Sequence, residues 1–108
     1  MIKELRSLGE LDSALKSAGK KLVFVNYSSP KCGLCKGTDR LIQGLAEERP
    51  HIVFLKINTE EVKECIDAFG ITGLPAFQYY RGPIKLYEFA GANKDHILEK
   101  LCEFDVDF

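Results

Sequence analysis

Two short, almost continuous apolar runs constrain the fold of this chain more than any other feature. One covers residues 22–27, the other covers residues 52–57, and both are rich in β-branched and aromatic side chains. Such runs are typical of strands buried on both faces of a sheet. Between them, residues 38–49 carry apolar side chains at helical spacing, and Pro50 follows. The order strand, helix, strand predicts a βαβ unit with two parallel strands.

The remaining segments predict further helices on both sides of this unit and a hairpin near the C-terminus. Ser7 and Glu10 have the spacing of a capping box, and Gly70 and Asn93 are a typical helix stop and helix cap. The expected elements are a weak strand near residue 2, helices over residues 8–18, 62–69 and 94–102, and strands over residues 76–80 and 84–89 around a turn at 81–83. Together they predict one α/β domain over residues 1–108, with a central mixed sheet of four to five strands flanked by four helices.

Length, charge and hydropathy exclude several classes of protein. The chain has 108 residues and a formal net charge of -1, which gives no reason to expect nucleic acid or an acidic membrane surface as a partner. No stretch approaches the roughly 18 apolar residues of a membrane helix. The N-terminus is charged from Lys3 onward and lacks the apolar core of a secretory signal. We therefore expect a cytoplasmic, monomeric protein that binds neither nucleic acid nor membrane.

The stretch SSPKCGLCKG places two cysteines between the first apolar run and the following helix. In a reducing compartment, such a close pair is more often redox-active or metal-binding than structural. Free backbone N–H groups and the helix dipole stabilise a negative sulfur at a helix start. We therefore expect Cys32 to be an exposed thiolate with a lowered pKa, and Cys35, one turn further on, to be its more buried partner.

A zinc site and a structural staple are the alternatives for this pair. Zinc needs about four ligands, whereas His51 and His96 have no partner at short spacing in the sequence. A permanent staple would close so small a loop that it would add little stability. The pattern therefore favours a redox pair and no metal. Cys65 is in phase with apolar residues and Cys102 follows one, so both are expected to be buried core residues.

The cysteine pair and three other segments resemble the thioredoxin family almost from end to end. The matching segments are Val23–Tyr27 ahead of Cys32-Gly33-Leu34-Cys35, residues 54–58, and Gly73-Leu74-Pro75-Ala76-Phe77. Residues 89–94 look like the eukaryotic cytosolic branch of the family. The resemblance implies the thioredoxin fold and a protein thiol–disulfide oxidoreductase. In this family the first cysteine attacks a protein disulfide to form a mixed disulfide, and the second cysteine resolves it.

The resemblance also implies a binding segment, partners and a source of electrons. The family proline at the position of Pro75 is cis and faces the active pair, and it helps present the backbone around Leu74 to an extended substrate. Gly73 belongs to the same segment. Disulfide-containing proteins are the implied substrates, and no bound cofactor is expected. Electrons are expected from NADPH through thioredoxin reductase.

Two departures from the family concern the chemistry of the sulfurs. Leu34 stands where the family usually has proline, which predicts a more oxidising disulfide. Asn26 stands where the family has a buried aspartate that pairs with the lysine matching Lys56 and relays the proton of the resolving thiol. An amide has no proton to exchange, so the sequence predicts that resolution by Cys35 is slow.

Two further departures change the rim of the site. Lys31 and Ser28 occupy the positions of two family tryptophans, and the chain contains no Trp. Lys31 predicts a cation beside Cys32 that favours the thiolate. Two rival functions follow from these departures: an oxidant or isomerase, and a low-turnover thioredoxin-like module that holds partners or an iron–sulfur centre.

Overall fold

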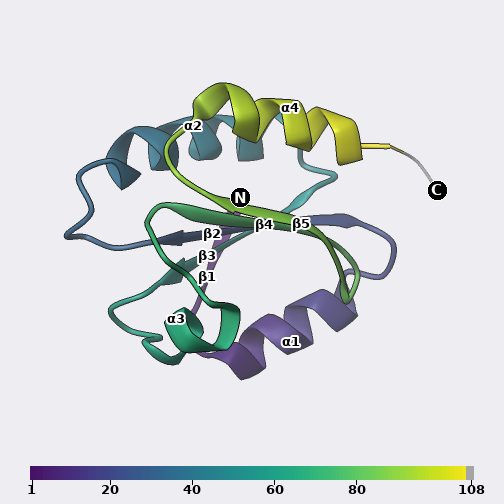
Figure 1. The fold of residues 1–108 in the computed structure, drawn as a ribbon. Helices are drawn as coiled ribbons and strands as arrows, with labels where there is room; N and C mark the ends of the chain where they lie inside the picture. Colours follow the sequence, from purple (N-terminus) through teal and green to yellow (C-terminus); the bar gives the residue numbers. More distant parts are fainter. Residues whose placement is uncertain (107–108) are drawn as a thin grey trace.

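The computed structural model describes residues 1–106 and has a five-stranded sheet between two layers of helices (Figure 1). The strands are β1 (Ile2–Leu5), β2 (Leu22–Ser28), β3 (Val53–Asn58), β4 (Ala76–Arg81) and β5 (Ile84–Ala90). The helices are α1 (Leu8–Ser17), α2 (Cys35–Glu48), α3 (Glu64–Phe69) and α4 (Lys94–Phe104). Helices α2 and α4 cover one face of the sheet, and α1 and α3 cover the other. The predicted α/β class, with a mixed sheet and four helices, is confirmed.

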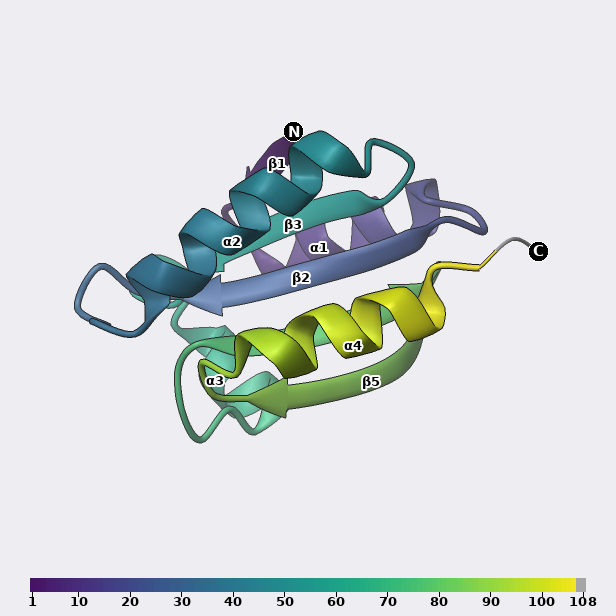
Figure 2. The same cartoon turned by 90° about the horizontal axis from the view of Figure 1, so that it is seen from above.

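The strand order is β1-β3-β2-β4-β5, and the view from above shows α2 and α4 lying across this sheet (Figure 2). β1 and β2 both run parallel to β3, which confirms the predicted βαβ unit. β4 runs antiparallel to β2, and β5 antiparallel to β4. Every residue of the central strand β2 is buried, so its sequence is an almost continuous apolar run, interrupted by Asn26, and not an alternation.

The ends of the helices follow local signals in the sequence. The side chain of Ser7 accepts a hydrogen bond from the Glu10 N–H at 3.0 Å, and Asn93 caps α4 in the same way. Gly70 ends α3 with a φ of 62°. Only α2 starts earlier than the apolar pattern predicts, at Cys35 instead of residue 38. Its first turn carries the cysteine chemistry and shows no apolar periodicity.

The sheet separates two apolar cores, one under each helical layer. Below α2 and α4, the ring of Phe24 lies 5.1–5.7 Å from three other aromatic rings, those of Phe54, Phe77 and Tyr79. The other core contains Cys65, which is fully buried as predicted. Burial raises the pKa of the Cys65 thiol, and the Glu64 carboxylate adds to the effect. Cys65 is therefore a neutral packing group.

A buried amide organises the polar groups of this second core. The Oε1 atom of Gln78 accepts hydrogen bonds from the hydroxyls of Tyr27 at 2.6 Å and Tyr80 at 2.8 Å. Burial raises the pKa of both phenols, that of Tyr80 to about 12, so both remain donors at neutral pH.

We expect Gln78→Leu to lower the free energy of unfolding by at least about 2 kcal/mol, because two buried hydroxyls lose their acceptor. Urea denaturation measures this change. Tyr80→Phe is the matched control: it removes one donor and leaves the Tyr27 bond in place, so it should destabilise the protein less. If the two variants are equally stable, the shared acceptor does not hold this core together.

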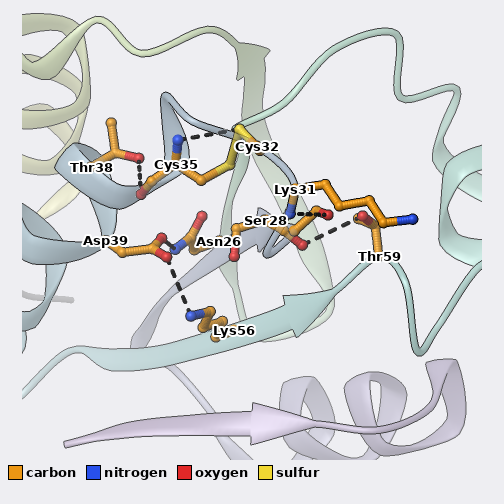
Figure 3. Close-up of a disulfide and its surroundings, with 10 residues drawn as sticks. Asn26, Ser28, Lys31, Cys32, Cys35, Thr38, Asp39, Lys56 and Thr59 are labelled. Carbon is orange, nitrogen blue, oxygen red and sulfur yellow. Dashed lines mark hydrogen bonds and ion pairs between the residues drawn. A yellow bond between two sulfur atoms is a disulfide. The ribbon is translucent and has the colours of Figure 1, made fainter.

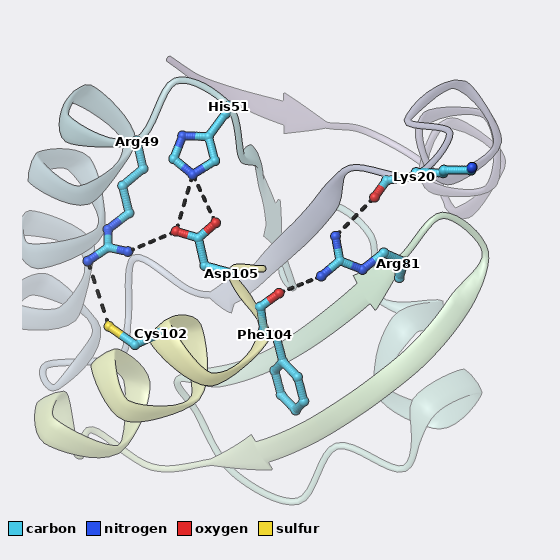
Figure 4. A network of polar contacts seen from close by, with 7 residues as sticks. All are labelled: Lys20, Arg49, His51, Arg81, Cys102, Phe104 and Asp105. Carbon is cyan, nitrogen blue, oxygen red and sulfur yellow. Dashed lines mark hydrogen bonds and ion pairs between the residues drawn. The ribbon is translucent and has the colours of Figure 1, made fainter. Parts of the chain in front are cut away.

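Polar contacts fix the end of α4 against the rest of the molecule (Figure 4). Arg49 and His51 contact the carboxylate of Asp105 at 3.1 and 2.9 Å. Arg81 donates hydrogen bonds to the backbone oxygens of Lys20 and Phe104. These contacts join the C-terminal end of α4 to the ends of α2 and β4.

The prediction that Cys102 is buried is wrong, because the structure exposes this residue. Consecutive residues of a helix point about 100° apart, so the burial of Leu101 turns Cys102 toward solvent. Its sulfur lies 3.8 Å from the guanidinium of Arg49. Cys102 and Cys65 are both free thiols.

Candidate active site

Cys32 and Cys35 are joined by a disulfide at the start of α2 (Figure 3). Their Cα atoms lie 5.4 Å apart. Cys35 is buried, with 1% of the residue exposed, whereas Cys32 is only partly covered. The backbone N–H of Cys35 donates to the Cys32 sulfur at 3.2 Å. The structure thus places an accessible sulfur in front of a buried one, as the sequence predicts.

Backbone groups, and not a neighbouring side chain, supply the positive charge at Cys32. The first N–H groups of α2 lack partners within the helix and carry the positive end of its dipole. Groups of this kind stabilise thiolates in proteins, and one of them, the N–H of Cys35, already donates to the Cys32 sulfur. The sequence predicts a cation from Lys31 at this sulfur, but the ammonium group pairs instead with Glu60 at 3.3 Å and extends away from the disulfide in Figure 3.

The segment Gly73-Leu74-Pro75 lies at the same edge of the sheet as the cysteine loop. It leads into β4, whose Ala76 pairs with Tyr27 at the end of β2. The Leu74–Pro75 peptide bond is cis, as the family resemblance implies. Within residues 1–106, neither the N–H nor the C=O of Leu74 is bonded to another group of the chain.

A carboxylate that the sequence analysis missed lies under the disulfide. Asp39 of α2 accepts a hydrogen bond from the Asn26 amide at 2.8 Å and pairs with the Lys56 amine at 3.3 Å (Figure 3). Asn26 and Lys56 are register partners on β2 and β3, which brings their side chains to one place. The signal in the sequence was the i,i+4 spacing of Cys35 and Asp39, which puts both on one helix face.

A cleft of about 260 Å³ opens beside the disulfide. Its lining includes Cys35, Asp39 and Lys56, together with Ser28 at the end of β2. A polar cleft of this size has room for several water molecules. Cys35 and Asp39 therefore face the same solvent-sized space.

Residues 1–106 contain neither a cluster of metal-binding side chains nor a membrane-spanning helix. No group of three or more His, Cys, Asp or Glu side chains in residues 1–106 is arranged to hold a metal ion. Over the same residues, no helix has the length and apolar character needed to cross a membrane.

A disulfide between cysteines three residues apart, at a helix start on the edge of this mixed sheet, defines a thioredoxin-fold thiol–disulfide oxidoreductase. The thioredoxin family model matches residues 6–103. Thioredoxin from Ophiophagus hannah is 31% identical over 104 residues, which cover 96% of this chain and 99% of that protein. Thioredoxin from Gallus gallus is 32% identical over 101 residues, 94% of this chain and 96% of that protein. This chain belongs to the thioredoxin family.

Solved structures show the same fold. The X-ray structure of Fasciola hepatica thioredoxin matches with a TM-score of 0.91 at 21% identity, over 95% of this chain and 99% of that one. Because the chain belongs to the thioredoxin family, the protein is a thiol–disulfide oxidoreductase with Cys32 and Cys35 as its active pair. Members of this family act on disulfide-containing substrates and need no bound cofactor.

Proposed function

We propose that the protein is a disulfide reductase in which Cys32 is the nucleophile and Cys35 the resolving thiol. The unequal exposure of the two sulfurs carries this assignment. The Cys32 thiolate attacks one sulfur of a substrate disulfide, and the other substrate sulfur leaves as a thiolate. Cys35 then loses its proton and attacks the Cys32 sulfur. This second step releases the remaining substrate thiolate and forms the disulfide seen in the structure.

We assign substrate binding to the segment Gly73-Leu74-Pro75. The unpaired backbone groups of Leu74 support this role, because an extended peptide can bond to them as it would to a strand edge. Gly33 and Leu34 form the exposed rim on the other side of the cysteines, and Leu34 is 65% exposed. A protein partner that reaches Cys32 would contact this rim as well.

The proposed compartment is the cytoplasm, and the proposed electron source is NADPH through thioredoxin reductase. The free thiols support a reducing compartment: Cys102 is exposed and unpaired, and Cys65 is buried and unpaired. In an oxidising compartment an exposed thiol would be prone to oxidation or pairing.

A coupled assay tests the electron source. With NADPH, a purified thioredoxin reductase and insulin as the disulfide substrate, we expect NADPH consumption that scales with the concentration of this protein. A parallel reaction replaces the reductase with glutathione, glutathione reductase and NADPH. Turnover in the glutathione reaction combined with none in the reductase reaction would contradict the proposed source.

A further inference from the structure

We propose that Asp39 is the group that takes up the Cys35 proton when the mixed disulfide is resolved, and that Asn26 positions Asp39 and Cys35 for this transfer. The inference rests on the proposed role of Cys35 as the resolving thiol. It assigns to α2 a carboxylate function that the family resemblance places on β2, at the position of Asn26.

Resolution requires a proton acceptor near a buried sulfur. The S–H bond of Cys35 breaks, and its electron pair forms the bond to the Cys32 sulfur. The bond between Cys32 and the substrate breaks, and its electron pair leaves on the substrate sulfur as a thiolate. The proton released by Cys35 goes to the Asp39 carboxylate. Because Cys35 is only 1% exposed, bulk solvent has little direct contact with this thiol.

The cleft supplies the path for this proton. Cys35 and Asp39 both line it, and its volume of about 260 Å³ leaves room for bridging water. Lys56 also lines the cleft and pairs with the Oδ2 atom of Asp39 at 3.3 Å. The carboxylate is about 30% exposed, so water in the cleft can reach it from the solvent side and carry the proton away after turnover.

Asn26 has the donor and the acceptor that a positioning residue needs here. Its Nδ2 donates to Oδ1 of Asp39 at 2.8 Å, which fixes the carboxylate. Its Oδ1 is buried and has no hydrogen-bond partner within the described chain. Figure 3 shows the amide between the disulfide and Asp39. When the disulfide is reduced, the Cys35 S–H becomes the donor that this oxygen lacks, since buried polar atoms are rarely left unpaired.

Compared with the family pattern, the carboxylate lies on α2 instead of β2, but it still contacts Lys56 and position 26. Asn26 on β2 and Lys56 on β3 are register partners, and Asp39 contacts both side chains from α2. An aspartate at position 26 would point a negative charge directly at the Asp39 carboxylate. The amide instead donates a hydrogen bond to it, so Asn26 contacts Asp39 without like-charge repulsion. The other charged groups that line the cleft are Glu4, the register partner of Lys56 on β1, and Lys36 at the start of α2.

The proposal is tested by mixing the reduced protein with dithiobis(nitrobenzoate) and measuring how fast Cys35 resolves the mixed disulfide on Cys32. The attack of Cys32 on the reagent releases one nitrothiobenzoate ion. The attack of Cys35 on the resulting mixed disulfide releases a second one, in a step whose rate does not depend on reagent concentration. All variants carry Cys102→Ser, which removes the exposed free thiol. Asp39→Asn is compared with Glu47→Gln, which removes an exposed carboxylate from the same helix, and with the exchange Asn26→Asp combined with Asp39→Asn.

We expect Asp39→Asn to slow the second release by about 10²-fold, the low end of what a general base contributes. Glu47→Gln should match the parent protein, and the exchange variant should recover most of the rate. The pH profile distinguishes proton transfer from a purely structural role. Near neutral pH the parent rate should change little, whereas the Asp39→Asn rate should keep rising with pH because only base from solvent remains to take the proton.

An unchanged rate and pH profile in Asp39→Asn would overturn the proposal. A folded exchange variant that stays slow would also overturn it, because the carboxylate would then matter only for structure; thermal unfolding reports folding in each variant. Failure of the underlying assignment looks different. If Cys35→Ser still gives the second, concentration-independent release, then Cys35 is not the resolving thiol.

Discussion

Cys32→Ser is expected to reduce the rate of insulin reduction by dithiothreitol to the rate of dithiothreitol alone. A serine hydroxyl is not ionised at neutral pH and cannot form a mixed disulfide, whereas the Cys32 sulfur accepts a hydrogen bond from the Cys35 N–H at the start of α2, a contact that favours its thiolate. Precipitation of the reduced insulin chains measures the rate. No other described cysteine can replace Cys32, because Cys35 and Cys65 are buried and Cys102 lies at the far end of α4.

Cys35→Ser should stop insulin reduction at a different step from Cys32→Ser. The nucleophile is intact, so the first step proceeds and the mixed disulfide with the substrate accumulates. Mass spectrometry under acid quench should show this adduct on Cys32. Cys102→Ser is the matched control, and it should keep full activity because its sulfur lies outside the site. Full activity in Cys32→Ser would place the chemistry elsewhere. A wild-type protein that fails to accelerate insulin reduction would favour the low-turnover binding module.

The architecture could be predicted from the sequence because its signals are local. The apolar runs of β2 and β3 need burial on both faces, and the caps at Ser7 and Asn93 need only a residue three positions away. The position of the active pair follows from the same reasoning, since the two cysteines fall between a strand and a helix.

Contacts between residues far apart in the chain could not be predicted from the sequence. Nothing local marks Asp39 as a partner of Asn26, which is 13 residues away, or of Lys56, which is 17 residues away. The pairing exists because parallel strands put Asn26 and Lys56 side by side beneath α2. Glu60 diverts Lys31 from Cys32 for the same reason: the loop after β3 lies close to the loop after β2.

Local periodicity also failed where a single residue decides the outcome. Cys102 follows Leu101, and its place beside an apolar residue predicts burial. In α4 the buried side chains are Ile97 and Leu101, four residues apart, so the next position turns toward solvent. Cys65, in contrast, is truly buried, and burial raises its pKa.

The direction of the physiological reaction depends on the midpoint potential of the Cys32–Cys35 couple. For the proposed reductase we expect a value between about −270 mV, as for thioredoxin, and roughly −200 mV, because Leu34 in place of the family proline predicts a more oxidising disulfide. Equilibration against dithiothreitol and glutathione with thiol trapping measures it. A value above roughly −200 mV would contradict this direction and favour the oxidant or isomerase. If the two cysteines show no reversible redox couple, the result favours the low-turnover binding module.

Leu34→Pro tests how the helix start sets this potential. Leu34 has a φ of -71° and a ψ of -24°, which proline adopts without strain, and its N–H makes no bond to other groups of residues 1–106. The rigid ring limits the freedom that the two sulfurs gain on reduction, so it favours the disulfide. We expect the potential to fall by about 30 mV, a tenfold change in the equilibrium constant. Leu34→Ala removes the same apolar side chain without rigidity and should not lower the potential. Equal shifts in both variants would mean that the exposed leucine side chain, and not backbone freedom, sets the potential of this site.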